Sequence, residues 1–394
     1  MTHNGRKKLI LSIDSMIASF IALGFFSKEF YLLPSGSLQI GDIFLLLAFF
    51  LCLFSGKVFL ERIDYPLILF LILSFIINVI YYLYYDDSTF LKYSFYTLFS
   101  VIVVILFRTI INDKRVACFS MVSLKLAIIT QFVLYLLGKG RYFFGRYSGT
   151  FNDPNQFGYY ILMCLFLIYV FQHLNKEKMH VAWIVLPGYL ILLSQSSGML
   201  VGYAVFLAFF IWKLTGDSSN TIKTITRVAA VFFLLFSMLL LFTVNDLSQF
   251  DNLNNTRISG FRRIINRLSR VGSLKDFFES FVRDRSLSRV IENPTGLLYG
   301  TGEGMWSRYS AGNEIHSSMI SLCFYYGIIP YSLWALWIKS NLQNLSPALS
   351  CVYVAHIAEA FTLANHRQPF FWIMFVLASH ELAKAQISKG IEDE

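Results

Sequence analysis

Long apolar stretches recur from one end of this 394-residue chain to the other, and they constrain its fold more than any single motif. A helix needs about 20 mainly apolar residues to cross the hydrocarbon core of a membrane. Charged residues make up only 14% of the chain, whereas a soluble domain usually has about 25%. The sequence therefore predicts an all-α bundle of membrane helices and argues against an ordinary soluble protein.

We expect about twelve transmembrane helices in a single membrane domain covering residues 1–394. One long hydrophilic outer loop at 246–315 interrupts this domain. The polar run Ser194–Gly198 divides an apolar stretch that is too long for one crossing, and we interpret it as a tight turn at the membrane surface. The expected spans lie near residues 9–26, 39–55, 64–84, 91–110, 116–137, 155–172, 180–195, 197–213, 228–245, 316–337, 346–363 and 370–384.

The formal net charge of +9 would suggest a nucleic-acid partner in a soluble protein, but membrane proteins collect lysine and arginine in their cytoplasmic loops. If the basic N-terminus is placed inside the cell and the spans alternate, most basic loop residues fall on the cytoplasmic side. We therefore expect both termini in the cytoplasm and no nucleic-acid partner. The five cysteines all fall in apolar segments, so we expect no disulfide framework, no metal site and no cofactor.

Two outward segments are basic where the charge rule predicts few basic residues: the loop 138–154, with Arg141 and Arg146, and the long loop 246–315. Within the long loop, residues 257–270 and 274–291 have the spacing of amphipathic helices that lie in the membrane interface. Guanidinium groups bind phosphate through paired hydrogen bonds and stay charged at any relevant pH. These arginines, including Arg262 and Arg263, are therefore candidate ligands of a lipid-linked phosphate; contact with anionic lipid is the alternative.

The sequence Ser148–Asn155 is typical of a structured turn that leads into a helix. Asn152 or Asp153 is suited to cap that helix, with Pro154 in its first turn. A helix that begins at the outer surface also presents free N–H groups to an anion. The turn is thus either a candidate anion site, with Asn152 and Asn155, or a capped loop without further function.

His316 stands at the expected outer start of the tenth span, directly after the arginine-rich loop. Histidine has an unperturbed pKa of about 6.5, so it can take a proton from a sugar hydroxyl at neutral pH. Glu314 and Glu303 are rival candidates for this role as general base, and packing or capping is the alternative for His316. Gly300–Gly304 follows no strand, so a nucleotide-binding loop is not indicated.

Polar groups also cluster near the expected outer end of the eleventh span. Arg367 lies in the short loop that follows this span and is a further candidate for binding an anionic substrate. His356 and Glu359 are three residues apart within the span and so share one face of a helix. Pairing of Glu359 with Arg367 or Lys125 would be a structural role, whereas lining a polar cavity would be a functional one.

The order of these motifs resembles the O-antigen polymerase and O-antigen ligase families of bacterial inner-membrane proteins. The run Arg146–Asn155 resembles their R-x-SGTF-x-x-PN element, and His316-Ser317-Ser318 followed by Gly327 resembles the H-[NS]-x-x…G element that closes their large outer loop. Ser194–Gly198 resembles their T-x-SR-[GS] turn, although no arginine stands there in this chain. The similarity covers residues 140–330 by motif and the whole chain by layout.

The resemblance implies a metal-independent glycosyltransferase without a cofactor that acts on undecaprenyl-diphosphate-linked glycans at the periplasmic face of the inner membrane. By the same resemblance, Arg146 and other outer arginines would hold the donor diphosphate, and His316 would activate the acceptor hydroxyl. Membrane lipids, a chain-length regulator and a flippase of the same pathway would be the further partners.

The motifs leave the acceptor open. A polymerase transfers the glycan to another lipid-linked repeat unit, which we favour because Phe-rich chains without a strong catalytic signature are typical of polymerases. A ligase would transfer it to the lipid A core. A flippase for the same lipid-linked units would instead need cationic groups along a central cavity, for which only Lys125 is a candidate.

Overall fold

A computed structural model describes residues 3–32, 38–214, 282, 285–309, 312–343 and 345–379, and it is predominantly helical with almost no strand. The prediction of a helical protein is therefore confirmed. The elements are α1 (His3–Ser27), α2 (Ile40–Phe54), η1 (Arg62–Asp64), α3 (Tyr65–Tyr85), α4 (Thr89–Ile110), α5 (Lys114–Leu136), β1 (Arg141–Phe143), β2 (Arg146–Gly149), α6 (Pro154–Leu174), α7 (Ala182–Ser194), α8 (Ser197–Leu214), α12 (Ser288–Glu292), α13 (Gly296–Tyr299), η2 (Trp306–Arg308), α14 (Ser318–Tyr326), α15 (Ile328–Leu342) and α16 (Pro347–Ala360), followed by a last helix, Pro369–Ser379.

Within the described ranges, four helical segments are long and apolar enough to cross a membrane: Arg62–Tyr85, Thr89–Ile110, Lys114–Leu136 and Pro154–Leu174. Shorter apolar helices accompany them at Ile13–Ser27, Ile40–Phe54, Ala182–Ser194, Ser197–Lys213 and Pro369–Ser379. Many large apolar side chains on α2, α3 and α5 are exposed on the outside of the bundle. Such an apolar surface is typical of helices whose solvent is lipid.

Helices lie where the sequence predicts them in the described part of the chain, and the expected break at Ser194–Gly198 separates α7 from α8. Gln195 adopts a left-handed conformation there (φ 51°) and ends α7. The expected span 316–337 is instead two helices, α14 and α15, which meet at Gly327. Gly327 has a φ of 76°, and an added Cβ atom would approach Leu298 O to 2.6 Å, so only glycine fits at this break.

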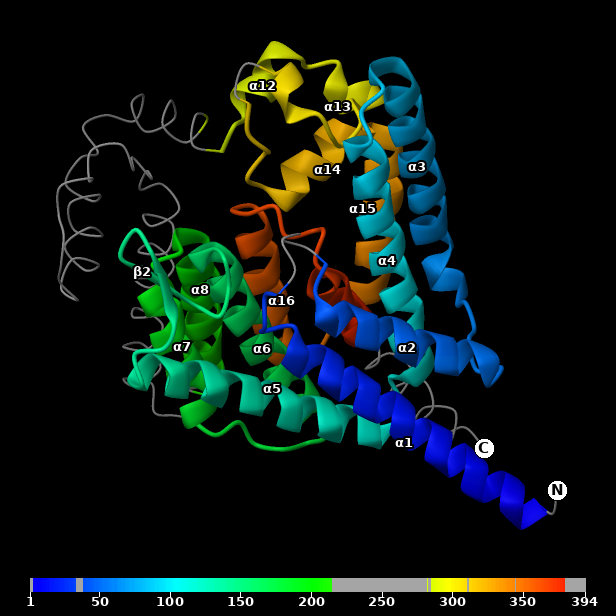
Figure 1. The fold of residues 1–394 in the computed structure, drawn as a ribbon, viewed down its shortest axis with the longest axis vertical. Helices are drawn as coiled ribbons and strands as arrows, with labels where there is room; N and C mark the ends of the chain where they lie inside the picture. The colour runs from blue at the N-terminus through cyan, green and yellow to red at the C-terminus, as the bar shows by residue number, and fades with distance from the viewer. Residues whose placement is uncertain are drawn as a thin grey trace.

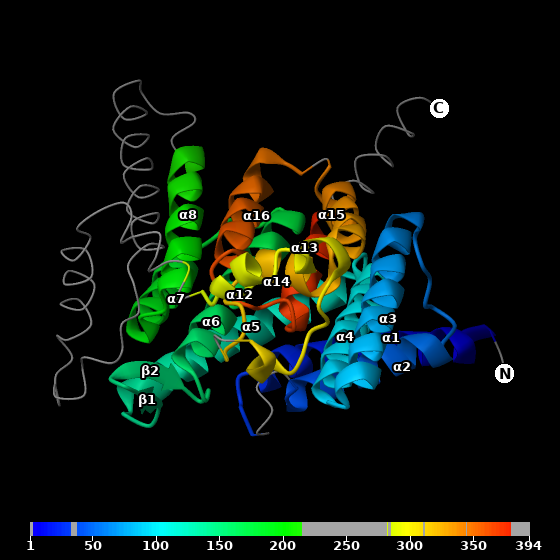
Figure 2. The same ribbon diagram turned by 90° about the horizontal axis from the view of Figure 1, so that it is seen from above.

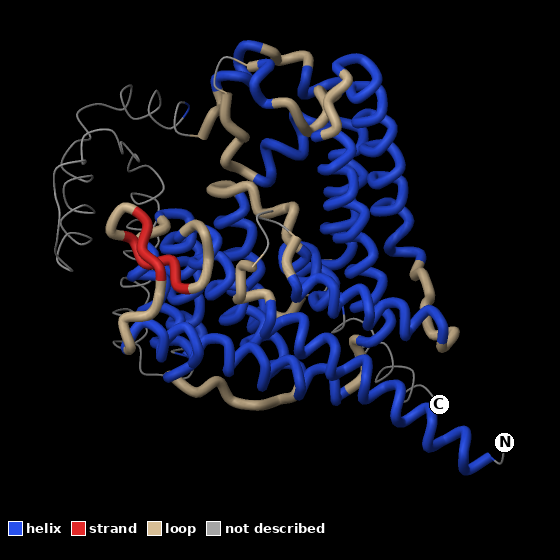
Figure 3. The backbone as a smooth tube through the Cα atoms, in the orientation of Figure 1, coloured by secondary structure: helices blue, strands red, loops and turns tan. Residues whose placement is uncertain are grey.

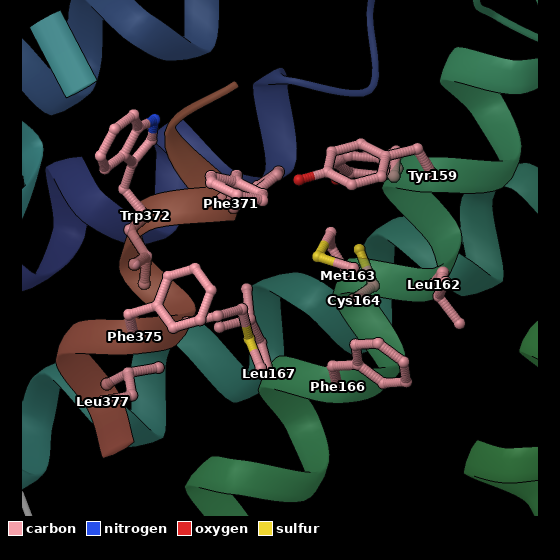
Figure 4. Close-up of a cluster of buried hydrophobic side chains, with 14 of the residues drawn as sticks. Tyr159, Leu162, Met163, Cys164, Phe166, Leu167, Phe371, Trp372, Phe375 and Leu377 are labelled. Atoms are coloured by element: carbon pink, nitrogen blue, oxygen red, sulfur yellow. The ribbon is translucent and has the colours of Figure 1, made fainter. Parts of the chain in front are cut away.

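The helices pack in groups, and α6 lies against α5, α7, α8 and α16. Helix α8 packs on α16, α3 packs on both α4 and α15, and α1 packs on α2 and α5 (Figure 1 and Figure 2). Almost every side chain of α6 is buried, which makes this helix the centre of the core. Tyr159, Met163 and Leu167 of α6 face the aromatic residues Phe371 and Phe375 of the last helix (Figure 4).

The loop 138–154 contains a β-hairpin that the prediction of an all-α fold did not include (Figure 3). Strands β1 and β2 pair in antiparallel orientation and are joined by Phe144 and Gly145, both with positive φ. Two residues with positive φ form the turn whose twist matches that of paired strands. The alternating pattern is too short to stand out in an apolar chain, which is why sequence patterning missed the hairpin.

The described end of the long loop is folded onto the bundle rather than extended. Helices α12 and α13 lie over α14 (Figure 1), and η2 lies beside α3 and α4, with Trp306 against Tyr93. Of the two expected interfacial helices, 257–270 lies outside the described residues, as do Arg262, Arg263 and the expected span 228–245. Only residues 282 and 285–291 of the expected helix 274–291 are described, and α12 begins there at Ser288.

A buried ion-pair network ties η1, α4, α15 and the last helix together. Arg108 of α4 is 2% exposed and contacts both carboxylate oxygens of Asp64, with the closer nitrogen at 2.7 Å. Nη2 also donates to Asn341 at 2.8 Å, Nη1 donates to Ser379, and Trp337 donates to Asp64 at 3.0 Å. We name Arg108, Asp64, Asn341, Ser379 and Trp337 the Arg108 network. With its charge balanced and its donors occupied, it stabilises the packing of four chain segments.

Candidate functional site

Glu303 is held at the far end of α3 by a glycine-rich turn. Gly302 adopts a φ of 67°, and a Cβ atom there would approach the ring of Tyr81 to 2.9 Å. This close passage brings the backbone N–H of Glu303 to the side-chain oxygen of Asn78, at 2.8 Å. The glycines of Gly300–Gly304 therefore allow the backbone to pass close to α3, and this close packing accounts for the glycine-rich sequence.

The Glu303 carboxylate is buried, with 1% of its side chain exposed, and it contacts three side chains from two other segments. Arg367 contacts Oε1 through Nε at 2.8 Å and Nη2 at 2.7 Å, and His366 Nε2 lies 3.0 Å from the same oxygen. The hydroxyl of Tyr326 donates to Oε2 at 2.7 Å. Because a buried carboxylate requires partners for its lone pairs, this saturated arrangement fixes Glu303 in place.

Arg367 joins Glu303 to the second candidate carboxylate, Glu314, through an ion pair from its Nη1 atom. Its guanidinium also lies over the rings of Tyr93 and Trp306, at 4.4 Å and 4.9 Å from their centroids. One arginine is thus shared by two carboxylates. We name Glu303, Glu314, His366 and Arg367 the carboxylate cluster.

The loop that carries His366 and Arg367 is fixed to the start of α14 by one serine. The Ser318 hydroxyl accepts from the backbone N–H groups of Asn365 and His366, at 2.7 Å and 3.1 Å. The Ser318 N–H in turn donates to Leu363 O at 2.9 Å. Ser317 caps α14 by accepting from Ile320 N. The serines after His316 therefore hold the site together.

The electrostatics of the cluster favour ionised carboxylates. Burial raises the pKa of Glu303, but the charges of Arg367 and His366 outweigh it and lower the pKa to about 2. Burial likewise opposes ionisation of Glu314, and Arg367 again outweighs it, so the pKa of Glu314 lies below its ordinary value. A carboxylate with a lowered pKa is a weak base. Glu314, with 30% of its side chain exposed, is the more accessible of the two carboxylates.

His316 is half-buried beside this cluster. Its backbone N–H donates to Arg285 O at 3.1 Å, and Arg285 Nη1 lies 3.3 Å from His316 O. Burial lowers the pKa of His316, and the negative charge of Glu314 offsets this only in part. The imidazole is therefore neutral near pH 7 and able to accept a proton. Of the predicted candidates for general base, His316 has the most suitable protonation state.

The structure assembles the predicted residues of the hairpin and turn into a separate group. Arg146 is 7% exposed and donates to Ser194 O at 2.9 Å and to the side chain of Asn155 at 2.7 Å. Arg141 is exposed and donates to Asn152 at 2.7 Å. Asp153 caps α6 by accepting from the N–H groups of residues 155 and 156, as predicted for Asn152 or Asp153. These contacts occupy the first N–H groups of α6.

A small cavity of about 20 Å³ lies between the two groups. Gln156 and Tyr159 each place a buried oxygen atom there that has no hydrogen-bond partner among the described residues. The lining residues are Lys28, Tyr31, Phe151, Gln156, Tyr159, Tyr160, Asn365, Gln368 and Phe370.

Several residues of the site were not predicted. Tyr326, Tyr93 and Trp306 look like ordinary core aromatics in the sequence, and nothing in the pattern separates them from the others. Asn78 does carry a signal, because a lone amide in an apolar helix is expensive to bury without a partner. His356 and Glu359 pair with each other at 3.3 Å, and Asn365 donates to Glu359 at 2.9 Å. Lys125 lies instead over the ring of Trp183.

Among the described residues, no three histidine, cysteine, aspartate or glutamate side chains are placed to hold a metal ion. Compared with known proteins, the chain matches no family model, no curated protein and no solved structure.

Proposed function

We propose that this chain is a bacterial inner-membrane glycosyltransferase of the O-antigen polymerase type. It would join undecaprenyl-diphosphate-linked oligosaccharide units into a surface polysaccharide. The proposal is carried by one observation: Glu303, Glu314, His316 and Arg367, which the sequence singled out in three separate segments, lie at one place in the fold.

The proposed topology has twelve membrane crossings, with both termini in the cytoplasm. In this topology the end of α3, the start of α4, the start of α14 and the end of α16 are all periplasmic. These are the helix ends that surround the carboxylate cluster. A site at this face is accessible to lipid-linked glycans on the outer leaflet, which supports a periplasmic reaction.

In the proposed reaction, His316 accepts the proton of the acceptor hydroxyl while Glu314 orients the acceptor sugar. The acceptor oxygen forms a bond to the anomeric carbon of the donor, and the bond from that carbon to the diphosphate oxygen breaks. The lipid diphosphate leaves with the electron pair. The lowered pKa of His316 supports this role, because a base must be neutral before it can accept a proton.

The carboxylate cluster also suits a sugar substrate. Ionised carboxylates accept hydrogen bonds from sugar hydroxyls, and aromatic rings pack against sugar faces. Tyr93 and Trp306 lie beside Arg367 and Glu314, with Trp306 partly exposed. Arg367 itself is engaged by two carboxylates, so we assign it to positioning them rather than to the donor diphosphate.

The test is a gel of surface polysaccharide from a strain that lacks this chain and carries the wild type, His316→Ala or His180→Ala. His180 is an exposed histidine before α7 and serves as the matched control. We expect a ladder of long chains with the wild type and His180→Ala, and a core with one repeat unit without the chain or with His316→Ala. Equal protein levels are checked by immunoblot.

Two other outcomes would overturn parts of the proposal. Bare core together with accumulated lipid-linked polymer in the deletion strain would indicate a ligase. An intact ladder with His316→Ala would remove His316 as the general base and leave the reaction class standing.

A further inference from the structure

The buried cations of this chain differ in whether a carboxylate balances them. Lys28 pairs with Asp42 at 2.6 Å, Arg108 with Asp64 at 2.7 Å and Arg367 with Glu303 at 2.7 Å. Such pairing is the rule for buried charges, because an isolated ion loses its hydration without compensation. Arg289, on α12, departs from this rule.

Arg289 has no exposed surface, and no carboxylate of the described residues pairs with it. Its Nε and Nη2 atoms are buried without a hydrogen-bond partner in the described part of the chain. Nη1 reaches only the hydroxyl of Tyr325, at 3.4 Å. No described carboxylate therefore balances this guanidinium, and its Nε and Nη2 atoms present unused N–H groups.

Arg308, on η2, shares an aromatic ring with Arg289. The two guanidinium carbons lie 4.9 Å (Arg289) and 4.8 Å (Arg308) from the ring centroid of Tyr309. Nη2 of Arg308 donates to the backbone oxygens of Thr301 and Gly302, and its Nε is buried without a partner among the described residues. No ion pair to a described carboxylate neutralises Arg308 either. Two guanidinium groups without a described carboxylate partner thus lie against Tyr309, and Arg308 is also close to the rings of Tyr81 and Phe90, at 5.2 Å and 5.0 Å. Two like charges this close repel each other.

We propose that Arg289 and Arg308 bind a phosphate-type anion. The identity of this anion rests on the proposed function: it is the diphosphate of the lipid-linked donor. Unused N–H groups on two guanidinium forks match the oxygens of a diphosphate, and its negative charge would offset the two positive charges. The ring of Tyr309 lies within cation–π distance of both guanidinium groups.

The position of this pair fits a donor site next to the acceptor site. Arg308 is anchored to the backbone of the two residues that precede Glu303. Trp306, two residues before Arg308, lies over Arg367 of the carboxylate cluster. The anion site and the carboxylate cluster therefore share the segment 301–309. This assignment moves the donor phosphate from Arg146 and Arg367, whose side chains are bonded to other groups of the chain, to Arg289 and Arg308.

The first test is binding of inorganic pyrophosphate to the purified full-length chain in nanodiscs of uncharged lipid, measured by isothermal titration calorimetry. We expect saturable binding that weakens roughly tenfold or more in Arg289→Gln and in Arg308→Gln, because each loses charge-assisted hydrogen bonds. Arg289→Lys keeps the charge without the fork and should be intermediate. Arg115→Gln, which changes an arginine paired with Asp14 and Asp113, is the control and should bind as the wild type.

A second measurement guards against variants that fail to fold. Ligand that binds only the folded state raises the unfolding temperature. Pyrophosphate should raise the unfolding temperature of the wild type and of Arg115→Gln, but not that of Arg289→Gln. No binding to the folded wild type, or equal binding to Arg289→Gln, would overturn the proposal.

Competition identifies the source of the anion. Undecaprenyl phosphate added to the nanodiscs should displace pyrophosphate, whereas phosphatidylglycerol at equal charge should not. Displacement by both would indicate a site for lipid headgroups in general and would overturn the assignment to the donor. The polysaccharide gel is independent of this assay. Pyrophosphate binding that depends on Arg289, found together with an unchanged ladder in the deletion strain, would leave the anion site standing and reject the polymerase.

Discussion

The Arg108 network and the carboxylate cluster lie at opposite ends of α3 and α4. Each is built on a buried arginine, but the two arginines bind different numbers of carboxylates. In the Arg108 network one arginine meets one buried aspartate, and amide, hydroxyl and indole groups complete the bonding. In the carboxylate cluster one arginine is shared by two glutamates, a histidine joins them, and Glu314 remains 30% exposed. The first centre is closed and balanced, which is typical of a structural lock. The second joins two carboxylates through one arginine, includes a histidine and has access from outside, and these are the properties of a site.

The largest expected effect tests the structural character of the Arg108 network. Asp64→Ala leaves Arg108 buried without its carboxylate, and breaking such a pair costs about 3–5 kcal/mol. We expect a large fall in the unfolding temperature, measured in detergent by intrinsic fluorescence. Glu61→Ala is the control, because Glu61 is 45% exposed and lies 3.8 Å from Arg108. Equal effects of both substitutions would contradict the comparison.

The second prediction concerns the response of the carboxylate cluster to acid. The pKa of Glu303 is about 2 in the folded chain, below its ordinary value of 4.5, so the cluster binds fewer protons folded than unfolded. Its stabilisation is therefore present above about pH 4.5 and is lost as the pH falls toward 2. We expect the wild type to lose on the order of a few kcal/mol over this range, and Glu303→Gln to lose clearly less. The measurement is the unfolding temperature against pH, and parallel curves for the two proteins would count against the assigned ion pairs.

The smallest expected effect separates burial from ion-pair chemistry. Arg115 also bonds two carboxylates, Asp113 and Asp14, but about a third of its side chain is exposed. Exposed pairs contribute only about 0–1 kcal/mol. Arg115→Gln should therefore shift the unfolding temperature slightly and leave the polysaccharide ladder unchanged. A loss of stability as large as that of Asp64→Ala would show that burial is not what distinguishes these centres.

The local sequence pattern was sufficient to predict most helices, but it did not predict the break between α14 and α15 or the β-hairpin. The apolar runs and the capping sequence before Pro154 predicted α6 closely, because both signals are local in the chain. The break at Gly327 was missed. Its cause is the close approach of Leu298 and Gly300, which only the folded chain brings there. The hairpin at 141–149 was missed because its strands are only three and four residues long.

The sequence by itself determined the class of this protein: apolar runs of membrane length, separated by short polar turns, allow few structures other than a helical bundle. It also singled out Glu303, Glu314, His316 and Arg367 by their chemistry. Only the tertiary structure decided how these residues pair. Glu303 binds Asn78 across 225 residues of chain and Arg367 across 64. Helix packing sets which side chains meet over such separations, and among the described residues the same packing leaves Arg289 and Arg308 without a carboxylate partner.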